Sequence, residues 1–242
     1  MAFNLKGRSL LSLIEETPEE IQFLVDLSYK LKQDKRAGNY NYNLKNKNIA
    51  LIFEKSSTRT RCAFVVACVD EGAHPEYLGA NDIQMGKKES IADTARVLGR
   101  MFDGIEFRGF SQKTVVDLAK YAGVPVWNGL TDEYHPTQVL ADLLMMQEKF
   151  GKLKGLTFTY VGDARNNMGN TLMIGCAKMG VNFKVGAPKS LWPEADLVEK
   201  CKVWAKEAGS TIEFFDDAKA SVKNADVIYT DCLLYTSLLK VL

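Results

Sequence analysis

Apolar and polar positions fall into successive blocks along the chain, and the first block predicts a helix. Thr17 precedes Pro18, and Glu20 stands three residues after Thr17. This is a capping box with proline at the first helical position. The apolar positions that follow at helical spacing are Ile21, Leu24, Val25 and Leu31. We therefore expect an amphipathic helix that Gly38 and the asparagine-rich stretch 39–48 bring to an end.

Strands and helices alternate after this stretch. The apolar run Asn48–Phe53 predicts a buried strand, and Thr58–Asp70, which is nearly apolar all round, predicts a buried helix. The further strands expected in this half are 104–108 and 124–127, and the further helices are 89–102, 113–122 and 137–150. Residues 74–76, which contain His74 before a proline, are expected in a turn at the surface.

The alternation starts again in the second half of the chain. The expected strands are 156–161, 182–187, 211–215 and 226–230, and the expected helices are 166–179, 193–208 and 217–224. Two such series predict an α/β protein with two domains, each a parallel sheet covered by helices. We assign 1–150 to the first domain and 151–242 to the second, with the helix at 137–150 as connector.

In a parallel sheet, ligands bind at the carboxyl ends of the strands. The loops of interest therefore follow Phe53, Arg108, Trp127, Val161 and Thr230.

Composition narrows the partners of the chain. The 242 residues carry 31 basic and 30 acidic side chains, a net charge of +1, which disfavours nucleic acid as a partner. No apolar stretch approaches the roughly 18 residues of a membrane helix, and the N-terminus lacks a signal-peptide pattern. The five cysteines form no CxxC pair and no zinc-ligand spacing. We expect reduced thiols in the cytoplasm, with Cys62 and Cys68 buried, and neither a metal nor a cofactor.

The segment Ser56–Arg61, where the strand gives way to a helix, carries four hydroxyl side chains and two arginines. The N-terminus of a helix attracts anions, while hydroxyl and guanidinium groups donate to phosphate oxygens. This pattern fits a phosphate site without a glycine-rich loop. It equally fits a capped helix with solvated arginines, because Ser and Thr are ordinary N-caps.

Two further loops carry candidate chemistry. His135-Pro136-Thr137-Gln138 lies where a strand gives way to a helix, and neutral imidazole and amide groups can both donate to a developing oxyanion. An N-cap histidine is the alternative. The loop 162–170 also joins a strand to a helix, but it lacks G-x-G-x-x-G and so disfavours a dinucleotide. Its paired asparagines suit an amino-acid head group.

These motifs together resemble the aspartate/ornithine carbamoyltransferase family. The shared segments are Ser-Thr-Arg-Thr-Arg at 57–61, Phe-Arg-Gly at 107–109 and His-Pro-Thr-Gln at 135–138. Three segments resemble the ornithine branch, namely 53–55, 84–90 and 163–168, and 93–101 is also similar to it. The resemblance extends from the N-terminus to Asp231.

The resemblance implies transfer of a carbamoyl group from carbamoyl phosphate to L-ornithine, giving L-citrulline and phosphate in arginine metabolism. It implies a homotrimer, or a multiple of trimers, in which Gln84 reaches the carbamoyl phosphate of an adjacent subunit. The carbamoyl phosphate contacts that it implies are Ser57, Thr58, Arg59, Thr60, Gln84, Arg108, His135 and Gln138. The ornithine contacts that it implies are Asn167 and Asp231.

The chemistry of this reaction needs such a set. Attack of a neutral amine on the carbonyl generates a tetrahedral oxyanion, for which Thr60, Arg108 and His135 are the expected donors. The leaving phosphate can accept the amine proton, so no general base is required. Positioning of two substrates in a dry, closed site is then the main contribution of the protein.

The chain departs from the family after Asp231. The family continues there with a Ser-Met-Gly loop and later a His-Cys-Leu-Pro segment, whereas 232–242 form a leucine-rich tail that matches neither. We therefore expect a C-terminally truncated chain with an incomplete second domain. Two alternatives remain beside ornithine carbamoylation. In the first alternative, the chain is a non-catalytic fragment that binds only carbamoyl phosphate. In the second, it uses putrescine or a modified ornithine as acceptor.

Overall fold

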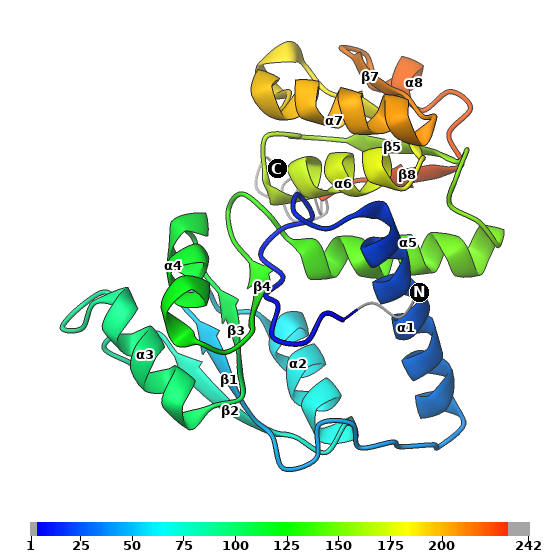
Figure 1. The fold of residues 1–242 in the computed structure, drawn as a ribbon. Coiled ribbons are helices and arrows are strands. Elements are labelled where there is room, and N and C mark those ends of the chain that lie inside the picture. The colour runs from blue at the N-terminus through cyan, green and yellow to red at the C-terminus, as the bar shows by residue number, and fades with distance from the viewer. Residues whose placement is uncertain (1–3, 232–242) are drawn as a thin grey trace, which may run out of the picture. The chain divides into compact units, whose positions relative to one another are not determined.

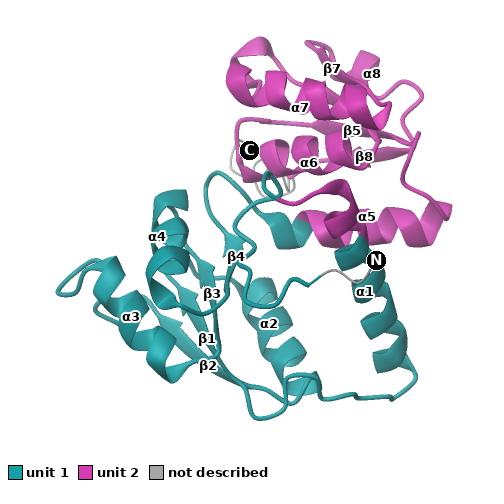
Figure 2. Cartoon of the chain, viewed as in Figure 1, with its two compact units in different colours: residues 1–15, 23–138 teal, residues 16–22, 139–242 magenta. Residues whose placement is uncertain are grey.

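The computed structural model describes residues 4–231 (Figure 1). The predicted unmatched tail at 232–242 lies outside these residues. The chain divides into two compact units, coloured separately in Figure 2. Unit 1 contains the residues up to Glu15 and Phe23–Gln138, and unit 2 contains Glu16–Gln22 and the residues from Val139 onward.

Unit 1 is built on a four-stranded parallel sheet in the order β2-β1-β3-β4. The strands are β1 (Asn48–Phe53), β2 (His74–Gly79), β3 (Gly104–Arg108) and β4 (Val126–Leu130). The helices are α2 (Thr58–Asp70), α3 (Ile91–Met101) and α4 (Gln112–Ala122), together with most of α1 (Pro18–Arg36) and the start of α5 (Pro136–Phe150). The sequence analysis predicted β1, β3 and β4 as strands of a parallel sheet. It did not predict β2 as a strand.

Successive side chains of β1 point to opposite faces of this sheet and pack against helices on both. Ala50 and Ile52 of β1 belong to one apolar cluster with residues of α3 and α4, whereas Leu51 packs with Cys68 of α2 on the opposite face. Strands buried on both faces have near-continuous apolar sequences, and this explains the uninterrupted run in β1. The predicted parallel sheet with helices on its faces is confirmed for this unit.

Unit 2 repeats the arrangement with the strand order β7-β6-β5-β8, again all parallel. Its strands are β5 (Thr157–Val161), β6 (Asn182–Gly186), β7 (Ile212–Phe215) and β8 (Val227–Tyr229). Its helices are α6 (Asn167–Lys178), the short η1 (Lys189–Leu191), α7 (Ala195–Ala208) and α8 (Ala218–Ser221), with the remainder of α5. The predicted α/β class is confirmed here as well.

Strand β2 corrects the predicted turn at residues 74–76. His74 begins β2, which pairs with β1 along its whole length. The sequence did not indicate this strand because Pro75 and the charged Glu76 are unusual in a strand. Proline is tolerated in edge strands, and β2 is an edge strand of the sheet. The side chain of His74 is exposed and lies 3.7 Å from Glu76, as expected for a surface position.

Helix α2 is less buried than its composition predicted. Cys68 is buried, but Cys62, Val66 and Val69 are exposed, so the prediction that Cys62 is buried is wrong. Six residues correspond to about 600° of rotation at 3.6 residues per turn, which places Cys62 and Cys68 on different faces of the helix. Only the face of α2 that contains Cys68 packs on the sheet.

The two units divide within α5, between Gln138 and Val139. The sequence placed the domain boundary after residue 150, at the other end of the same helix. The first turns of α1 also belong to unit 2. Lys178 Nζ donates to the Glu16 carbonyl at 2.6 Å, and Gln22 Nε2 donates to Gln147 Oε1 at 2.8 Å. These contacts explain why a short N-terminal segment belongs to the later unit.

Within residues 4–231, every helix is too short or too polar to cross a lipid bilayer.

Candidate active site

The start of α2 is arranged to hold an anion. Ser57 is the N-cap, and its side chain accepts a hydrogen bond from the Thr60 backbone N–H at 3.2 Å. No acidic residue occupies the first turn of α2, where Thr58 and Arg59 are exposed. The positive end of the helix dipole is therefore reinforced by an arginine rather than neutralised by a carboxylate.

Arg108 joins this loop to the sheet. It is the last residue of β3 and lies beside Phe53, the last residue of β1. Arg108 Nη1 donates to Thr60 Oγ1 at 3.0 Å, and the Arg108 carbonyl accepts from the Glu54 N–H at 2.9 Å. Two predicted site residues that are far apart in sequence therefore meet at the carboxyl edge of the sheet.

His135 lies close enough to Arg108 for the two to interact electrostatically. Burial lowers the pKa of the His135 imidazole to about 4, and the positive charge of Arg108 contributes to this shift. The imidazole is consequently neutral at pH 7. Its Nδ1 lies 3.4 Å from Thr137 Oγ1, and Gln138 follows in the first turn of α5.

Gln84 is separate from this group. It is exposed in the loop after β2, where its backbone carbonyl accepts from the N–H groups of Lys87, Lys88 and Glu89 at 3.0–3.2 Å. Within the described part of the chain, no hydrogen bond joins its side chain to Thr60, Arg108 or His135. The turn at 84–89 therefore presents an exposed amide side chain.

One charged residue at this site escaped the sequence analysis. Glu106 lies in the middle of β3, is 0% exposed and precedes Arg108 by two positions. Burial raises its pKa well above the usual value, while the charge of Arg108 opposes the shift. An acidic residue inside the apolar strand Gly104–Arg108 was the signal that could have identified it.

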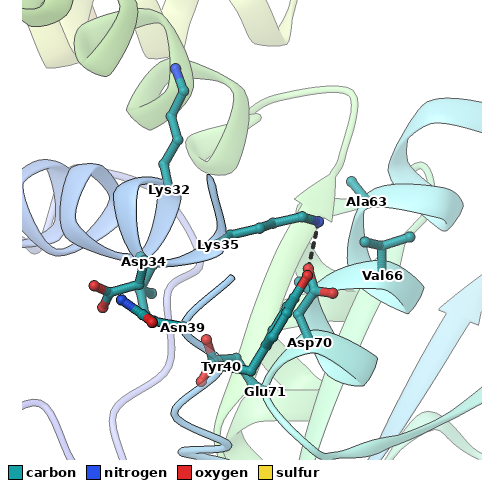
Figure 3. A pocket seen from close by; sticks show the side chains of 11 residues that line it. Lys32, Asp34, Lys35, Asn39, Tyr40, Ala63, Val66, Asp70 and Glu71 are labelled. Carbon is teal, nitrogen blue, oxygen red and sulfur yellow. Dashed lines mark hydrogen bonds and ion pairs between the residues drawn. The ribbon is translucent and has the colours of Figure 1, made fainter. Parts of the chain in front are cut away.

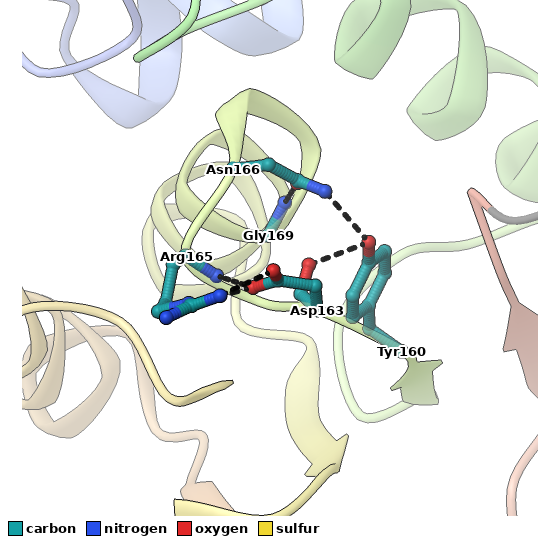
Figure 4. Close-up of polar contacts among 5 residues, drawn as sticks. All are labelled: Tyr160, Asp163, Arg165, Asn166 and Gly169. Carbon is teal, nitrogen blue, oxygen red and sulfur yellow. Dashed lines mark hydrogen bonds and ion pairs between the residues drawn. The ribbon is translucent and has the colours of Figure 1, made fainter. Parts of the chain in front are cut away.

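The corresponding loop of unit 2 is held by a dense set of polar contacts (Figure 4). Asn166 caps α6 by accepting from the N–H groups of Met168 and Gly169, each at 3.0 Å. Tyr160 donates from its hydroxyl to the Asp163 carbonyl at 3.0 Å. Arg165 donates to both carboxylate oxygens of Asp163, which lowers the pKa of that carboxyl. The loop is therefore held by hydrogen bonds and an ion pair among its own residues and Tyr160.

Asn167 and Asp231 are associated with neighbouring strands of the unit 2 sheet. Asn167 begins α6 just after β5, and Asp231 follows β8, the strand that pairs with β5. Both side chains therefore come from the carboxyl edge of the sheet, as the alternation predicted. Burial raises the pKa of Tyr229 on β8, with further contributions from the charges of Asp142 and Asp231.

A pocket of about 370 Å³ lies elsewhere in unit 1, between α1 and α2 (Figure 3). Lys35 and Asp70 form an ion pair across it. None of the predicted site residues lines this pocket. The candidate site is therefore defined by the strand ends and the start of α2 rather than by this cavity.

Comparisons with known proteins agree with this arrangement. Residues 8–148 match the family described as "Aspartate/ornithine carbamoyltransferase, carbamoyl-P binding domain". Residues 154–237 match "Aspartate/ornithine carbamoyltransferase, Asp/Orn binding domain". The two family models, one matched by residues of each α/β half of the chain, define the class as carbamoyltransferases. The chain belongs to the aspartate/ornithine carbamoyltransferase family and is an enzyme of the transferase class.

Its similarity lies with the ornithine branch of that family. It is 58% identical over 231 residues to "Ornithine carbamoyltransferase, catabolic" of Mycoplasma capricolum subsp. capripneumoniae, covering 96% of this chain and 74% of the relative. It is 59% identical to the ornithine carbamoyltransferase of Caldanaerobacter subterraneus subsp. tengcongensis, with the same coverage.

Among solved structures, the ornithine carbamoyltransferase from Pyrococcus furiosus superimposes with a TM-score of 0.94 at 42% identity, covering 98% of this chain and 75% of that chain. The sequence resemblance to this branch is thereby confirmed.

Proposed function

We propose that the chain transfers the carbamoyl group of carbamoyl phosphate to the side-chain amine of L-ornithine, giving L-citrulline and phosphate. The observation that carries the proposal is the hydrogen bond from Arg108 to Thr60 at the start of α2. It joins the guanidinium of Arg108, at the end of β3, to the loop that begins α2, and the neutral imidazole of His135 interacts with the same arginine. Such a site suits a dianion that carries a polarisable carbonyl.

The direction of that hydrogen bond supports a donor role for Thr60. Because Arg108 donates to Thr60 Oγ1, the hydroxyl proton of Thr60 must point elsewhere and is available to the substrate. Ser57, Thr58 and Arg59 would bind the phosphate oxygens, and Arg108 would contact both the phosphate and the carbamoyl oxygen. His135 and Gln138 would contact the carbamoyl group.

The reaction follows from these roles. The neutral side-chain amine of ornithine attacks the carbonyl carbon, and the resulting oxyanion accepts hydrogen bonds from Thr60, Arg108 and His135. The carbon–oxygen bond to phosphate then breaks, and the departing phosphate accepts the amine proton. Asn167 and Asp231 would hold the amino-acid part of ornithine, since an amide and a carboxylate complement its charged groups.

The proposal includes a homotrimer, or a multiple of trimers, in the cytoplasm. In that assembly the exposed Gln84 would reach the carbamoyl phosphate of a neighbouring subunit. The thiols of Cys62, Cys68, Cys176 and Cys201 are free, which supports a reducing compartment.

Phosphate release from carbamoyl phosphate by the purified 242-residue chain tests the reaction, with ornithine, putrescine and aspartate compared as acceptors and the carbamoylated product of each, citrulline for ornithine, identified. We expect ornithine to be the best acceptor. Faster turnover with aspartate would contradict the proposal, and faster turnover with putrescine would support the alternative acceptor. Phosphate binding without turnover would support the non-catalytic fragment. The chain spans 74% of the length of these relatives.

Arg59→Ala is expected to weaken phosphate binding by about 10- to 100-fold, because a charged hydrogen-bond donor contributes roughly 1.5–3 kcal/mol. Arg59 is exposed, so the free energy of unfolding should change by less than about 0.5 kcal/mol. Calorimetric titration with inorganic phosphate and urea unfolding measure the two quantities.

Arg61→Ala is the matched control for this variant. The Arg61 guanidinium lies 3.7 Å from the centre of the Tyr77 ring, so its removal should lower stability by about 1 kcal/mol and leave phosphate affinity unchanged. A large loss of stability in Arg59→Ala, with normal phosphate affinity of the folded variant, would identify the loop as structural.

A further inference from the structure

Glu106 is an acidic residue at the centre of the unit 1 sheet. β3 is paired on both edges, with Leu51 of β1 and Trp127 of β4 opposite Glu106. Ile105 and Phe107 belong to the cluster with α3 and α4. Since side chains alternate along a strand, Glu106 and Arg108 project from the other face of the sheet.

The carboxyl group of Glu106 fits closely against β4. A Cβ atom at Gly129 would lie only 1.8 Å from Glu106 Oε1, so any larger residue at 129 would collide with the carboxyl group. Gly129 is the residue that β4 inserts between Asn128 and Leu130, the partners of Phe107 and Arg108. The side chain thus reaches from the middle of β3 toward the strand end where Arg108 lies.

This carboxyl group has no local hydrogen bonds. Both of its oxygens are buried and have no hydrogen-bond partner among the described residues, and the same is true of Arg108 Nε. A buried carboxylate without hydrogen bonds is costly unless a positive charge compensates it or a proton neutralises it. The positive charge that acts on the carboxyl group is that of Arg108, which opposes the effect of burial on the pKa of Glu106 without cancelling it.

The other titratable side chains on this face of the sheet include Cys68 of α2 and Tyr77 of β2. On α2, the pKa of the Cys68 thiol is raised by burial and further by the charge of Glu106. Burial lowers the pKa of Arg108; the charge of Glu106 opposes this shift, and the charge of Arg59 reinforces it. His135 interacts with Arg108, whose charge helps to lower the pKa of the imidazole. The facing residues of β1 and β4 carry no titratable side chain.

We propose that Glu106 is a positioning residue that balances the charge of Arg108 while the phosphate site is empty and takes up a proton when a phosphate dianion binds there. The inference rests on the proposed role of Arg108 in phosphate binding. The bound anion neutralises the positive charge of Arg108. The guanidinium then stabilises the ionised form of Glu106 less, and the pKa of the carboxyl group rises. One proton moves from the buffer to the carboxylate, which becomes a neutral carboxylic acid.

The direction of the pH effect follows from linkage. Anion binding raises the proton affinity of Glu106, so the affinity for phosphate must fall as pH rises between the pKa values of the free and bound states. One proton corresponds to at most about a tenfold change in dissociation constant per pH unit. Glu106→Gln is neutral at every pH and should lack this part of the dependence.

Calorimetric titration with inorganic phosphate, in buffers of different ionisation enthalpy between about pH 6 and 9, tests the proposal. We expect the protein to take up more protons per phosphate than Glu106→Gln, with a difference of up to one. The ratio of dissociation constants, protein over variant, should rise with pH. Ionisation of phosphate itself cancels in the comparison. Glu199→Gln, at an exposed ion pair with Lys202, should behave as the unsubstituted protein.

A second measurement does not depend on the folding of the variant. Difference infrared spectra of the unsubstituted protein should gain a protonated carboxyl band when phosphate binds. Equal proton counts, or no such band, would overturn the role of Glu106 while leaving phosphate binding intact. Absence of phosphate binding to the unsubstituted protein would instead contradict the proposed function, and the inference would fall with it.

Discussion

Replacing Arg108 by glutamine is expected to weaken phosphate and carbamoyl phosphate binding by about 100- to 1000-fold, or roughly 3–4 kcal/mol. The guanidinium is half-buried, so its charge acts on a ligand with little screening. The substitution also removes the donor to Thr60 Oγ1 and leaves that hydroxyl without its orienting contact. Calorimetric titration with inorganic phosphate measures the loss.

Arg96→Gln is the control for this prediction. Arg96 is exposed on α3 and pairs with Asp93 at 2.8 Å, so its loss should leave affinity unchanged. The Arg108 variant must also remain folded, which circular dichroism and urea unfolding report. A folded Arg108→Gln variant that binds phosphate within about threefold of the unsubstituted protein would remove Arg108 from the site.

Substitution of His135 by alanine is the second large effect. Turnover to citrulline should fall by about 100- to 1000-fold, because one preorganised donor to an oxyanion contributes roughly 3–4 kcal/mol of barrier lowering. Phosphate affinity should hardly change, since a neutral imidazole adds no charge to the anion site. Steady-state rates measured in an active form of the enzyme, together with phosphate titration, separate the two quantities.

The protonation state of His135 provides an independent check. With its pKa lowered to about 4, the imidazole should remain neutral down to about pH 5, and its NMR titration should be centred near pH 4. His74→Ala, at an exposed position in β2, is the control for turnover. Normal turnover in His135→Ala would exclude this side chain as a donor, and a titration near pH 6.5 would contradict its burial next to Arg108.

Most helices and strands were predicted from the sequence because capping motifs and apolar periodicity lie within the segment that forms each element. The capping box at Thr17 is present, with hydrogen bonds of 3.0 and 3.2 Å between Thr17 and Glu20. β1 was predicted correctly because a strand covered on both faces is apolar throughout. β2 was missed because an edge strand that begins with His74 and Pro75 carries no such pattern.

The exposed face of α2 could not be predicted for a related reason. Apolar residues around the whole helix indicate burial, yet the sheet covers only the side that contains Cys68. Which face of a helix packs depends on the position of the neighbouring strands. That position is a property of the assembled unit and not of the thirteen residues of α2.

By itself, the sequence determined the α/β class, the order of nearly all elements and the residues that carry the family motifs. Each of these rests on spacing within a short segment or on a motif read directly from the chain. Tertiary structure decided the contact of Arg108 with Thr60, the neutrality of His135 and the burial of Glu106 beside Arg108. These depend on strand pairing and on exclusion of water, which bring together groups that no local pattern connects.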